Sequence, residues 1–376
     1  MLFDRPSSRR RFLAGTAIGA ATLASGGSAT TAFAQDIVSG TPDFSEAHQL
    51  SRYDPTVPPP SPGVYDLGDV QRLDAHFQSD GHRLAAHVYL PPAAARSAGR
   101  MPGIVIDAPG TSVKEITVPV YAIRLARAGY VVVSFDRRGF GASEGAVRQQ
   151  MDPPQNIRDV RNATTYLLSR GDVDPERIAI LGICMGGGHT IQAAAFDRRY
   201  RAVATLAGHY TNLRMAREGG DHVEWVASVR RRNDQRLADL RAGRPLTNRA
   251  FAPEGAPAGS AHAIMPEAFN FYESRQRLVG PSWRNEMTYE TQENMLSFDS
   301  VPYAGLIAPT PLLVIHGTID PLSPGKYAQA VFDQADDPKR IVWIETTNHS
   351  QLYDLEPYVS RASDEILRWF DTHVRG

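Results

Sequence analysis

The sequence predicts an α/β protein with a doubly wound, mostly parallel sheet and a helical cap insertion. Three observations carry this prediction. Short apolar runs that fit buried strands alternate with segments of helical apolar spacing. Residues 211–300 interrupt this alternation with a long polar segment. The only cysteine, Cys184, lies in a glycine-rich turn directly after an apolar run, where a strand gives way to a helix.

The N-terminus has the features of an export signal. Residues 8–13, Ser-Arg-Arg-Arg-Phe-Leu, resemble a twin-arginine signal, and the weakly apolar run 14–33 leads to a small-residue cleavage site ending at Ala34. The alternatives are a disordered basic tail or a membrane anchor, but the run is too polar for a spanning helix. We therefore expect residues 1–34 to direct export to the periplasm or the medium, with no stable membrane insertion of the mature chain.

The rest of the chain divides into an arm, a core and an insertion. The five prolines between positions 55 and 62 predict an extended N-terminal arm at residues 35–68. Alternating residues at 71–78 and 83–90, around Asp80-Gly81, predict an antiparallel hairpin. The remaining expected strands are 103–106, 130–135, 177–180, 202–207, 311–316 and 340–344. The expected helices are 118–128, 156–169 and 358–374, with a further helix at 223–241 inside the insertion. Residues 69–210 and 301–376 thus form the predicted core, with residues 211–300 as the cap.

The turn around Cys184 carries the first chemical signal. Its pattern is Gly-x-Cys-x-Gly, with glycines two residues before and two residues after the cysteine, where side chains would collide with neighbouring backbone. Such a turn lifts the cysteine above the sheet edge and directs a helix N-terminus at it, which favours the thiolate. The alternative is a buried cysteine that serves only as a small hydrophobic residue. The context favours Cys184 as a nucleophile.

Two further residues follow in the order that a nucleophile–acid–base triad requires. Asp320 comes just after the strand 311–316, and His349 comes just after the strand 340–344. Both positions lie at the carboxyl ends of strands, the edge at which such sheets bind ligands. We expect His349 to take and return the proton, and Asp320 to orient the imidazole. Asp320 could otherwise serve only as a turn residue, and His349 only as a helix cap.

Other candidate site residues follow from their position beside this edge. Backbone N–H groups of Met185 and Thr111 are expected to form an oxyanion hole. His209 and Tyr210, which follow another strand end, are candidates for a contact with the substrate. The arginine run at 230–232 is expected to be a solvated helix face, with an anion-binding role as the alternative. The segment 136–138 is expected to be structural.

Together these motifs resemble the α/β-hydrolase superfamily, and most closely the dienelactone-hydrolase-like group and related hydrolases and acyltransferases with a cysteine elbow. The motifs are Gly-x-Cys-x-Gly-Gly, Asp136-x-Arg138-Gly139-x-Gly141-x-Ser143, residues 109–115 and the ending His316-Gly317…Asp320…His349. The resemblance covers about residues 70–210 and 300–376. It implies the α/β-hydrolase fold and cleavage of an ester, lactone or thioester through an acyl-Cys184 intermediate. Acyl transfer by the same triad, and a non-catalytic binding protein on this scaffold, are the alternatives.

The composition of the chain limits the kinds of molecule that we expect the protein to bind. The 376 residues carry a formal net charge of -1, which argues against nucleic-acid binding. One cysteine excludes an intramolecular disulfide. No cluster has metal-ligand spacing and no phosphate-binding loop is present, so we expect no metal and no cofactor. The expected partner is a small acyl substrate, and the sequence leaves the oligomeric state open.

Overall fold

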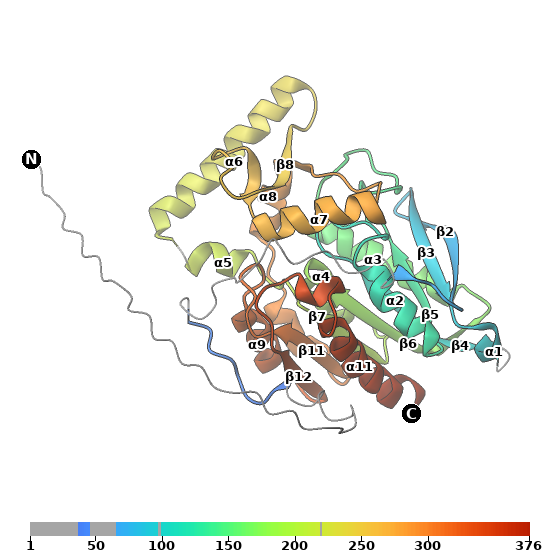
Figure 1. Ribbon diagram of the computed structural model, residues 1–376. Coiled ribbons are helices and arrows are strands. Elements are labelled where there is room, and N and C mark those ends of the chain that lie inside the picture. The colour runs from blue at the N-terminus through green and yellow to red at the C-terminus, as the bar shows by residue number, and fades with distance from the viewer. Residues whose placement is uncertain (1–36, 46–64, 97–98, 219) are drawn as a thin grey trace, which may run out of the picture. The chain divides into compact units, whose positions relative to one another are not determined.

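The computed structural model describes residues 37–45, 65–96, 99–218 and 220–376 (Figure 1). The predicted export signal at 1–34 and most of the predicted arm at 35–68 therefore lie outside the described residues. Two described residues of that arm, Ile37 and Val38, pair antiparallel with the edge strand β12 of the main sheet. Phe44 packs against Trp343 of the same strand, with 5.5 Å between the ring centroids.

The main sheet has nine strands in the order β1-β12-β11-β7-β6-β4-β5-β3-β2. The six strands from β12 to β5 run parallel, while β1, β3 and β2 pair antiparallel with their neighbours. The predicted fold class is therefore confirmed. The strands are β1 Ile37–Val38, β2 Gln71–Ser79, β3 His82–Leu90, β4 Met101–Asp107, β5 Val131–Phe135, β6 Val173–Ile183, β7 Ala202–Leu206, β11 Leu312–Gly317 and β12 Lys339–Ile344.

Helices cover both faces of this sheet, as expected when strands alternate with helices. The apolar sides of α2 and α11 pack in one buried cluster, and those of α3, α4 and α9 pack in the other. Each face of the sheet thus has its own hydrophobic core. The helices of the core are α1 Ala93–Arg96, α2 Val118–Arg127, α3 Pro153–Leu168, α4 Met185–Ala195, α9 Gly325–Gln334, α10 Gln351–Asp354 and α11 Tyr358–Phe370, with short turns of helix at η3 Val301–Leu306 and η4 Asp371–Arg375.

Local sequence signals account for most of the observed ends of helices and strands. Two elements, α3 and β6, begin earlier in the chain than the sequence predicts. The hairpin turns at Asp80 and Gly81, which both have positive φ, as the Asp-Gly pair predicts. Helix α3 begins at Pro153, earlier than the expected 156, because the Asp152 side chain accepts a hydrogen bond from the N–H of Gln155 and so caps the helix. Strand β6 begins at Val173, which pairs with Met101, so the segment before residue 177 is strand rather than loop.

The segment between β7 and η3 lies over the carboxyl edge of the sheet (Figure 1). Its helix α6, His222–Ala242, begins at an Asp221 cap and ends at Gly243 in the left-handed conformation, close to the expected helix at 223–241. The sequence missed a three-stranded sheet here, in the order β10-β8-β9. The other elements are α5 Leu213–Glu218, β8 Thr247–Ala252, β9 Ala261–Ile264, α7 Pro266–Leu278, β10 Met287–Thr288 and α8 Glu290–Leu296. We call residues 211–300 the cap.

Candidate active site

Cys184 lies at the turn between β6 and α4, in a conformation that the surrounding backbone imposes. Its φ is 54° and its ψ is -118°, a region that costs a non-glycine residue about 1–3 kcal/mol. A Cβ on Gly182 would overlap the carbonyl oxygen of Gly186, and a Cβ on Gly186 would overlap that of Asp107. The expected reason for the two glycines is therefore confirmed. The N–H of Cys184 donates to Leu206 O at 3.0 Å, and its carbonyl accepts from His209 N–H at 2.7 Å.

The structure brings Cys184, Asp320 and His349 together at the carboxyl edge of the sheet. His349 follows β12, and its Nδ1 lies 2.6 Å from Asp320 Oδ2. Asp320 follows β11, and its Oδ1 accepts a hydrogen bond from the N–H of Ser323 at 2.8 Å. The opposite nitrogen of the imidazole, Nε2, lies 2.7 Å from the Tyr353 hydroxyl, and Cys184 and His349 line the wall of one cavity. All three side chains are nearly excluded from solvent.

The electrostatics of this group favour a charged pair. Burial alone raises the pKa of the Cys184 thiol, but the positive charge of His349 and hydrogen bonds from His349 and Tyr353 outweigh it, so the pKa lies below its usual range. Burial alone lowers the pKa of His349, but the Asp320 carboxylate and Cys184 outweigh it and raise that pKa well above its usual value. The two directions agree with a thiolate beside an imidazolium.

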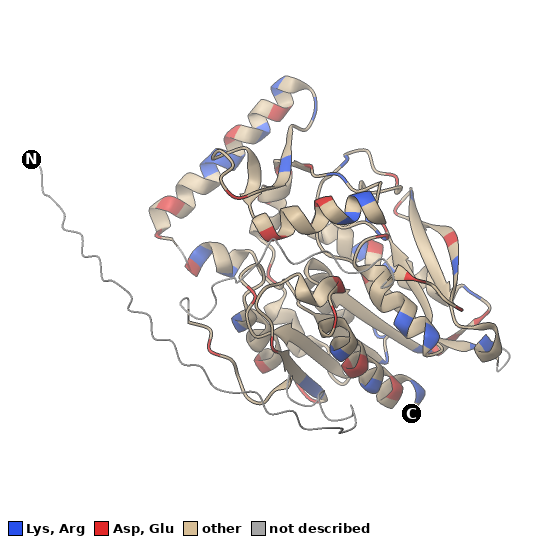
Figure 2. Cartoon of the chain, viewed as in Figure 1, with Lys and Arg blue, Asp and Glu red and all other residues tan. Residues whose placement is uncertain are grey.

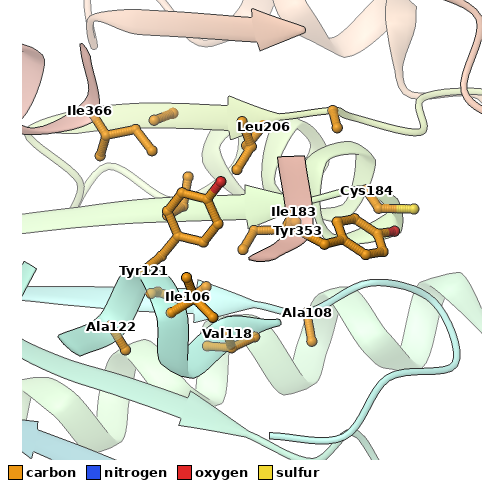
Figure 3. Packing of buried hydrophobic residues seen from close by; sticks show 14 of the residues in the cluster. Ile106, Ala108, Val118, Tyr121, Ala122, Ile183, Cys184, Leu206, Tyr353 and Ile366 are labelled. Atoms are coloured by element: carbon orange, nitrogen blue, oxygen red, sulfur yellow. The ribbon is translucent and has the colours of Figure 1, made fainter. Parts of the chain in front are cut away.

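Tyr353 is a member of this group that the sequence did not reveal. Its hydroxyl lies 2.7 Å from His349 Nε2, and its ring packs edge-on against the imidazole, with 4.9 Å between centroids. Figure 3 shows the Tyr353 side chain next to Cys184 at one end of the packed core. The spacing of four residues from His349, across the start of helix α10, was the available signal, because i and i+4 share a helix face.

The loop that carries Thr111 is held in place by hydrogen bonds from a buried arginine. The Arg137 guanidinium pairs with Asp107 at 2.8 Å and donates to the carbonyl oxygens of Ala108, Pro109 and Gly110. Asp107 Oδ2 in turn lies 2.9 Å from Nδ1 of the buried His189. Burial raises the pKa of Asp107, but the charge of Arg137 outweighs this and leaves that pKa lowered. Arg137 thus positions the loop next to Cys184.

A cavity of about 540 Å³ opens above Cys184, and both the core and the cap line it. Met185 and Thr111, the expected oxyanion-hole residues, lie in its wall beside Cys184 and His349. Most of the lining is apolar, and six of the eight methionines of the chain contribute to it. Unbranched methionine side chains adapt to irregular apolar ligands. The methionines are Met151, Met185, Met215, Met265, Met287 and Met295.

The two predicted substrate contacts differ in their location. His209 lines the cavity, and its Nδ1 and Nε2 lie 3.3 Å from Ser323 Oγ and 3.1 Å from Asn212 Oδ1. Tyr210 does not line the cavity: its hydroxyl lies 2.7 Å from Thr205 Oγ1, and its ring packs in the core on the other side of the sheet. Successive residues after a strand end point in opposite directions, so only one of the pair can face the cavity.

Helix α7 attaches the cap to the loop that carries His349. The Glu267 carboxylate accepts a hydrogen bond from the N–H of Ser350 at 2.6 Å, and burial raises the pKa of Glu267. About two turns further along α7, Arg275 donates to both carboxylate oxygens of Asp354, each at 2.8 Å. No local sequence pattern predicts either contact, because the partners are about 80 residues apart. The position of the cap is therefore coupled to the position of His349.

Two absences apply to the part of the chain that the structure describes. No helix within it is both long and apolar enough to traverse a bilayer. Among the same residues, no three His, Cys, Asp or Glu side chains are grouped so that they could hold a metal ion.

Comparisons with known proteins concern the family and the fold. The family model described as X-Pro dipeptidyl-peptidase (S15 family) matches residues 80–351. The thiohydrolase aneE of Aspergillus aculeatus is 28% identical over 281 residues, covering 73% of this chain and 84% of its own. The polyketide transferase claH of Penicillium crustosum is 25% identical over 251 residues, covering 64% of this chain and 79% of its own.

Solved structures give the same fold. The crystal structure of a hypothetical protein of Pseudomonas aeruginosa superposes with a TM-score of 0.72 at 26% identity, covering 82% of this chain and 96% of that one. An α/β-hydrolase, GrgF of a Penicillium species, superposes with a TM-score of 0.67 at 22% identity, covering 81% of this chain and all of that one. At that identity the second likeness concerns the fold alone.

Proposed function

The chain belongs to the X-Pro dipeptidyl-peptidase (S15) family within the α/β-hydrolase superfamily, and we propose that it cleaves an ester, lactone or thioester through a Cys-His-Asp triad. It is an enzyme of the hydrolase or acyltransferase type. The observation that carries the finer proposal is that Cys184 and His349 line the same cavity, while Nδ1 of His349 lies 2.6 Å from Asp320.

The proposed first half-reaction uses the charges already present. The Cys184 thiolate attacks the carbonyl carbon of the substrate, and the negative charge moves to the carbonyl oxygen. The N–H groups of Met185 and Thr111 stabilise this oxyanion, and one such donor is worth about 3 kcal/mol. When the tetrahedral intermediate collapses, the bond to the leaving group breaks, and His349 gives its proton to that group. The acyl group is then bound to Cys184 as a thioester.

The second half-reaction returns the enzyme to its starting state. His349, now neutral, takes a proton from water, and the resulting hydroxide attacks the acyl-Cys184 carbonyl. The carboxylic acid product leaves, and the thiolate and the imidazolium are restored. An amine leaving group is harder, because the intermediate expels the thiolate more easily than the amine. The cysteine therefore favours esters, lactones and thioesters over peptides, despite the peptidase in the family description.

Acyl transfer is the second candidate, and the lining of the cavity favours it. Transfer needs an acceptor alcohol or amine in place of water, which requires that water be excluded from the acyl-enzyme. A cavity of about 540 Å³ lined mainly by apolar side chains provides such a site. One curated relative is named a polyketide transferase. The triad and the first half-reaction are the same in both candidates.

The test is turnover of aryl esters, lactones and acyl thioesters by the wild-type protein and by Cys184→Ala. We expect the variant to lose activity by a factor on the order of 10⁴, with acyl adduct mass on the wild type only. The same reactions are repeated with an added alcohol or amine acceptor, and the free acid and the acylated acceptor are quantified. Free acid as the main product favours hydrolysis, and acylated acceptor as the main product favours acyl transfer. Equal turnover by both proteins, with no adduct, would remove Cys184 as nucleophile and favour a binding protein on the hydrolase scaffold.

We also propose that the substrate is a small acyl compound and that the protein acts outside the cytoplasm. The export signal predicted at 1–34 supports the second point. Its test is the mass of the protein recovered from the periplasm of an expressing cell, with and without replacement of Arg9 and Arg10 by lysine. The signal predicts a chain that begins at Gln35 and an exported fraction that the double replacement abolishes.

A further inference from the structure

Among the described residues, one cation in the wall of the cavity, Arg232, forms no ion pair. Arg232 projects from α6 and lines the cavity that contains Cys184. Its Nη1 donates to the carbonyl oxygen of Ser228 at 2.8 Å, one turn earlier in the same helix. Its Nε is buried without a hydrogen-bond partner among the described residues. No carboxylate within residues 37–45, 65–96, 99–218 and 220–376 lies within ion-pair distance of it.

The neighbouring arginines of α6 show that this situation is specific to Arg232. Arg231 pairs with Glu224 at 2.7 Å, and Arg236 pairs with Glu293 at 2.6 Å. Both acidic and basic side chains are present along α6 (Figure 2). No such ion pair forms at Arg232: the carboxylate of Glu293 on α8 attracts it at longer range, but that carboxylate is already paired with Arg236. A guanidinium keeps its proton even where burial lowers its pKa, so Arg232 is a partly desolvated cation.

The surroundings of Arg232 form a polar end to an otherwise apolar cavity. Arg232 and Gln292 also line a second cavity of about 310 Å³, whose other residues are Ser228, Arg231, Gln235 and Tyr289. All six of these residues are polar or can hydrogen bond through their side chains. Cys184 and His349 line only the first, apolar cavity. A ligand that reaches from Cys184 to Arg232 therefore passes methionine and phenylalanine side chains and ends among donors.

We infer that the substrate is an acyl compound with a carboxylate at the far end of its chain, and that Arg232 binds this carboxylate. The apolar lining suits a hydrocarbon chain between the scissile carbonyl and the carboxylate. It suits a pantetheine-type leaving group poorly, because the amides of such an arm would lose their hydrogen bonds to water there. The planar guanidinium matches a carboxylate with two parallel hydrogen bonds. This inference rests on the proposed function, since it places the scissile bond at Cys184.

The test compares para-nitrophenyl esters that differ only at the far end of the acyl chain. A homologous series of chain lengths ending in carboxylate, hydroxyl or methyl is assayed for kcat/KM with the wild type, Arg232→Met, Arg232→Lys and Arg230→Met. At the preferred length, we expect Arg232→Met to reduce the ratio of carboxylate to methyl substrate by about 10- to 100-fold. Arg232→Lys should recover part of that ratio, and Arg230→Met should leave it unchanged, because Arg230 is exposed on the same helix and lines neither cavity.

A binding measurement separates failure of this inference from failure of the proposed function. Monomethyl esters of dicarboxylic acids and the matching methyl esters of monocarboxylic acids are titrated into Cys184→Ala, alone and combined with Arg232→Met. Tighter binding of the acidic probe that is lost with Arg232→Met supports the inference even if no ester is hydrolysed. A ratio that Arg232→Met does not change, a hydroxyl-ended substrate that depends equally on Arg232, or a dependence found only with phosphate-bearing thioesters would overturn it.

Discussion

The carboxyl edge of the sheet and the cap above it are held in different ways. Cys184 is 7% exposed, Asp320 and His349 are each 1% exposed, and the turn, loop and strand ends that carry them are hydrogen bonded to one another. In the cap, none of the 21 residues of α6 is buried, and Val223 and Leu240 are about three-quarters exposed, at 75% and 77%. The proposed catalytic residues thus lie in the more constrained of the two regions, and most of the proposed substrate contacts lie in the less constrained one.

This difference teaches how one scaffold can support several reactions. The reacting groups require fixed geometry, because small displacements reduce the rate strongly. Methionine side chains are flexible, so substitutions in the part of the cavity wall that the cap forms can change the shape of the cavity without moving the residues at the carboxyl edge of the sheet. Only α7, through Glu267 and Arg275, connects the cap firmly to the loop of His349 among the contacts described above. Substitutions in the two regions should therefore differ in size and kind.

The largest effect is expected at the sheet edge. His349→Ala should reduce turnover by a factor on the order of 10³–10⁴, because the proton acceptor and donor is lost. It should also raise the pKa of Cys184, since burial then acts without the opposing charge of His349. As the pH is lowered, Cys184 of the wild type should remain a thiolate below the pH at which an ordinary cysteine becomes protonated. In His349→Ala, Cys184 should become protonated at a higher pH than in the wild type.

The measurement is the rate of iodoacetamide alkylation of Cys184 as a function of pH. The exposed His76 supplies the control, and His76→Ala should leave the alkylation midpoint where it is in the wild type. A midpoint that does not move in His349→Ala would contradict the proposed thiolate–imidazolium pair.

The next largest effect is expected on the stability of the fold, at the buried ion pair of Arg137 and Asp107 next to the carboxyl edge of the sheet. Arg137→Met leaves the Asp107 carboxylate buried without its main charge partner and frees three loop carbonyls. The free energy of unfolding should fall by about 3–5 kcal/mol. Arg127→Met, which removes an exposed pair with Asp69 at 3.8 Å, should cost about 0–1 kcal/mol. Urea denaturation at neutral pH measures both, and similar losses in the two variants would disprove the positioning role of Arg137.

A smaller effect is expected where the cap meets the core. Arg275→Met removes two hydrogen bonds to Asp354, which keeps its bond from the Tyr65 hydroxyl. The free energy of local opening of α7 should fall by about 1–3 kcal/mol, while the strands of the sheet keep their protection. Hydrogen exchange read out by mass spectrometry distinguishes the two regions. The exposed Arg277→Met is the matched control, and equal deprotection of sheet and cap would refute independent anchoring of the cap.

The smallest effect is expected on the outer face of α6. Leu240→Gln replaces a side chain that is 77% exposed, so the free energy of unfolding should change by no more than about 0.5 kcal/mol. Thermal unfolding and kcat/KM should both stay close to the wild-type values. A loss of several kcal/mol would mean that this face is buried in solution against another molecule.

Local patterns in the sequence were sufficient for much of this protein. The apolar runs give the parallel strands, Asp80-Gly81 gives the hairpin turn, and the glycines at 182 and 186 give the turn at Cys184. Chain order then assigns Asp320 and His349, because strand ends in a parallel sheet meet at one edge. These features depend on a few residues near one another in sequence, or on the direction of the strands.

The tertiary structure alone decided what surrounds these residues. Arg137 lies in a segment expected to be structural, but its loop contacts depend on the packing of β5 beside β4. Tyr353 faces Cys184 because α10 turns back over the sheet edge. Arg232 belongs to a run expected to be solvated, and only the folding of the cap over Cys184 brings it to the cavity. The physical reason is that burial and charge pairing depend on segments far apart in sequence, which no local pattern encodes.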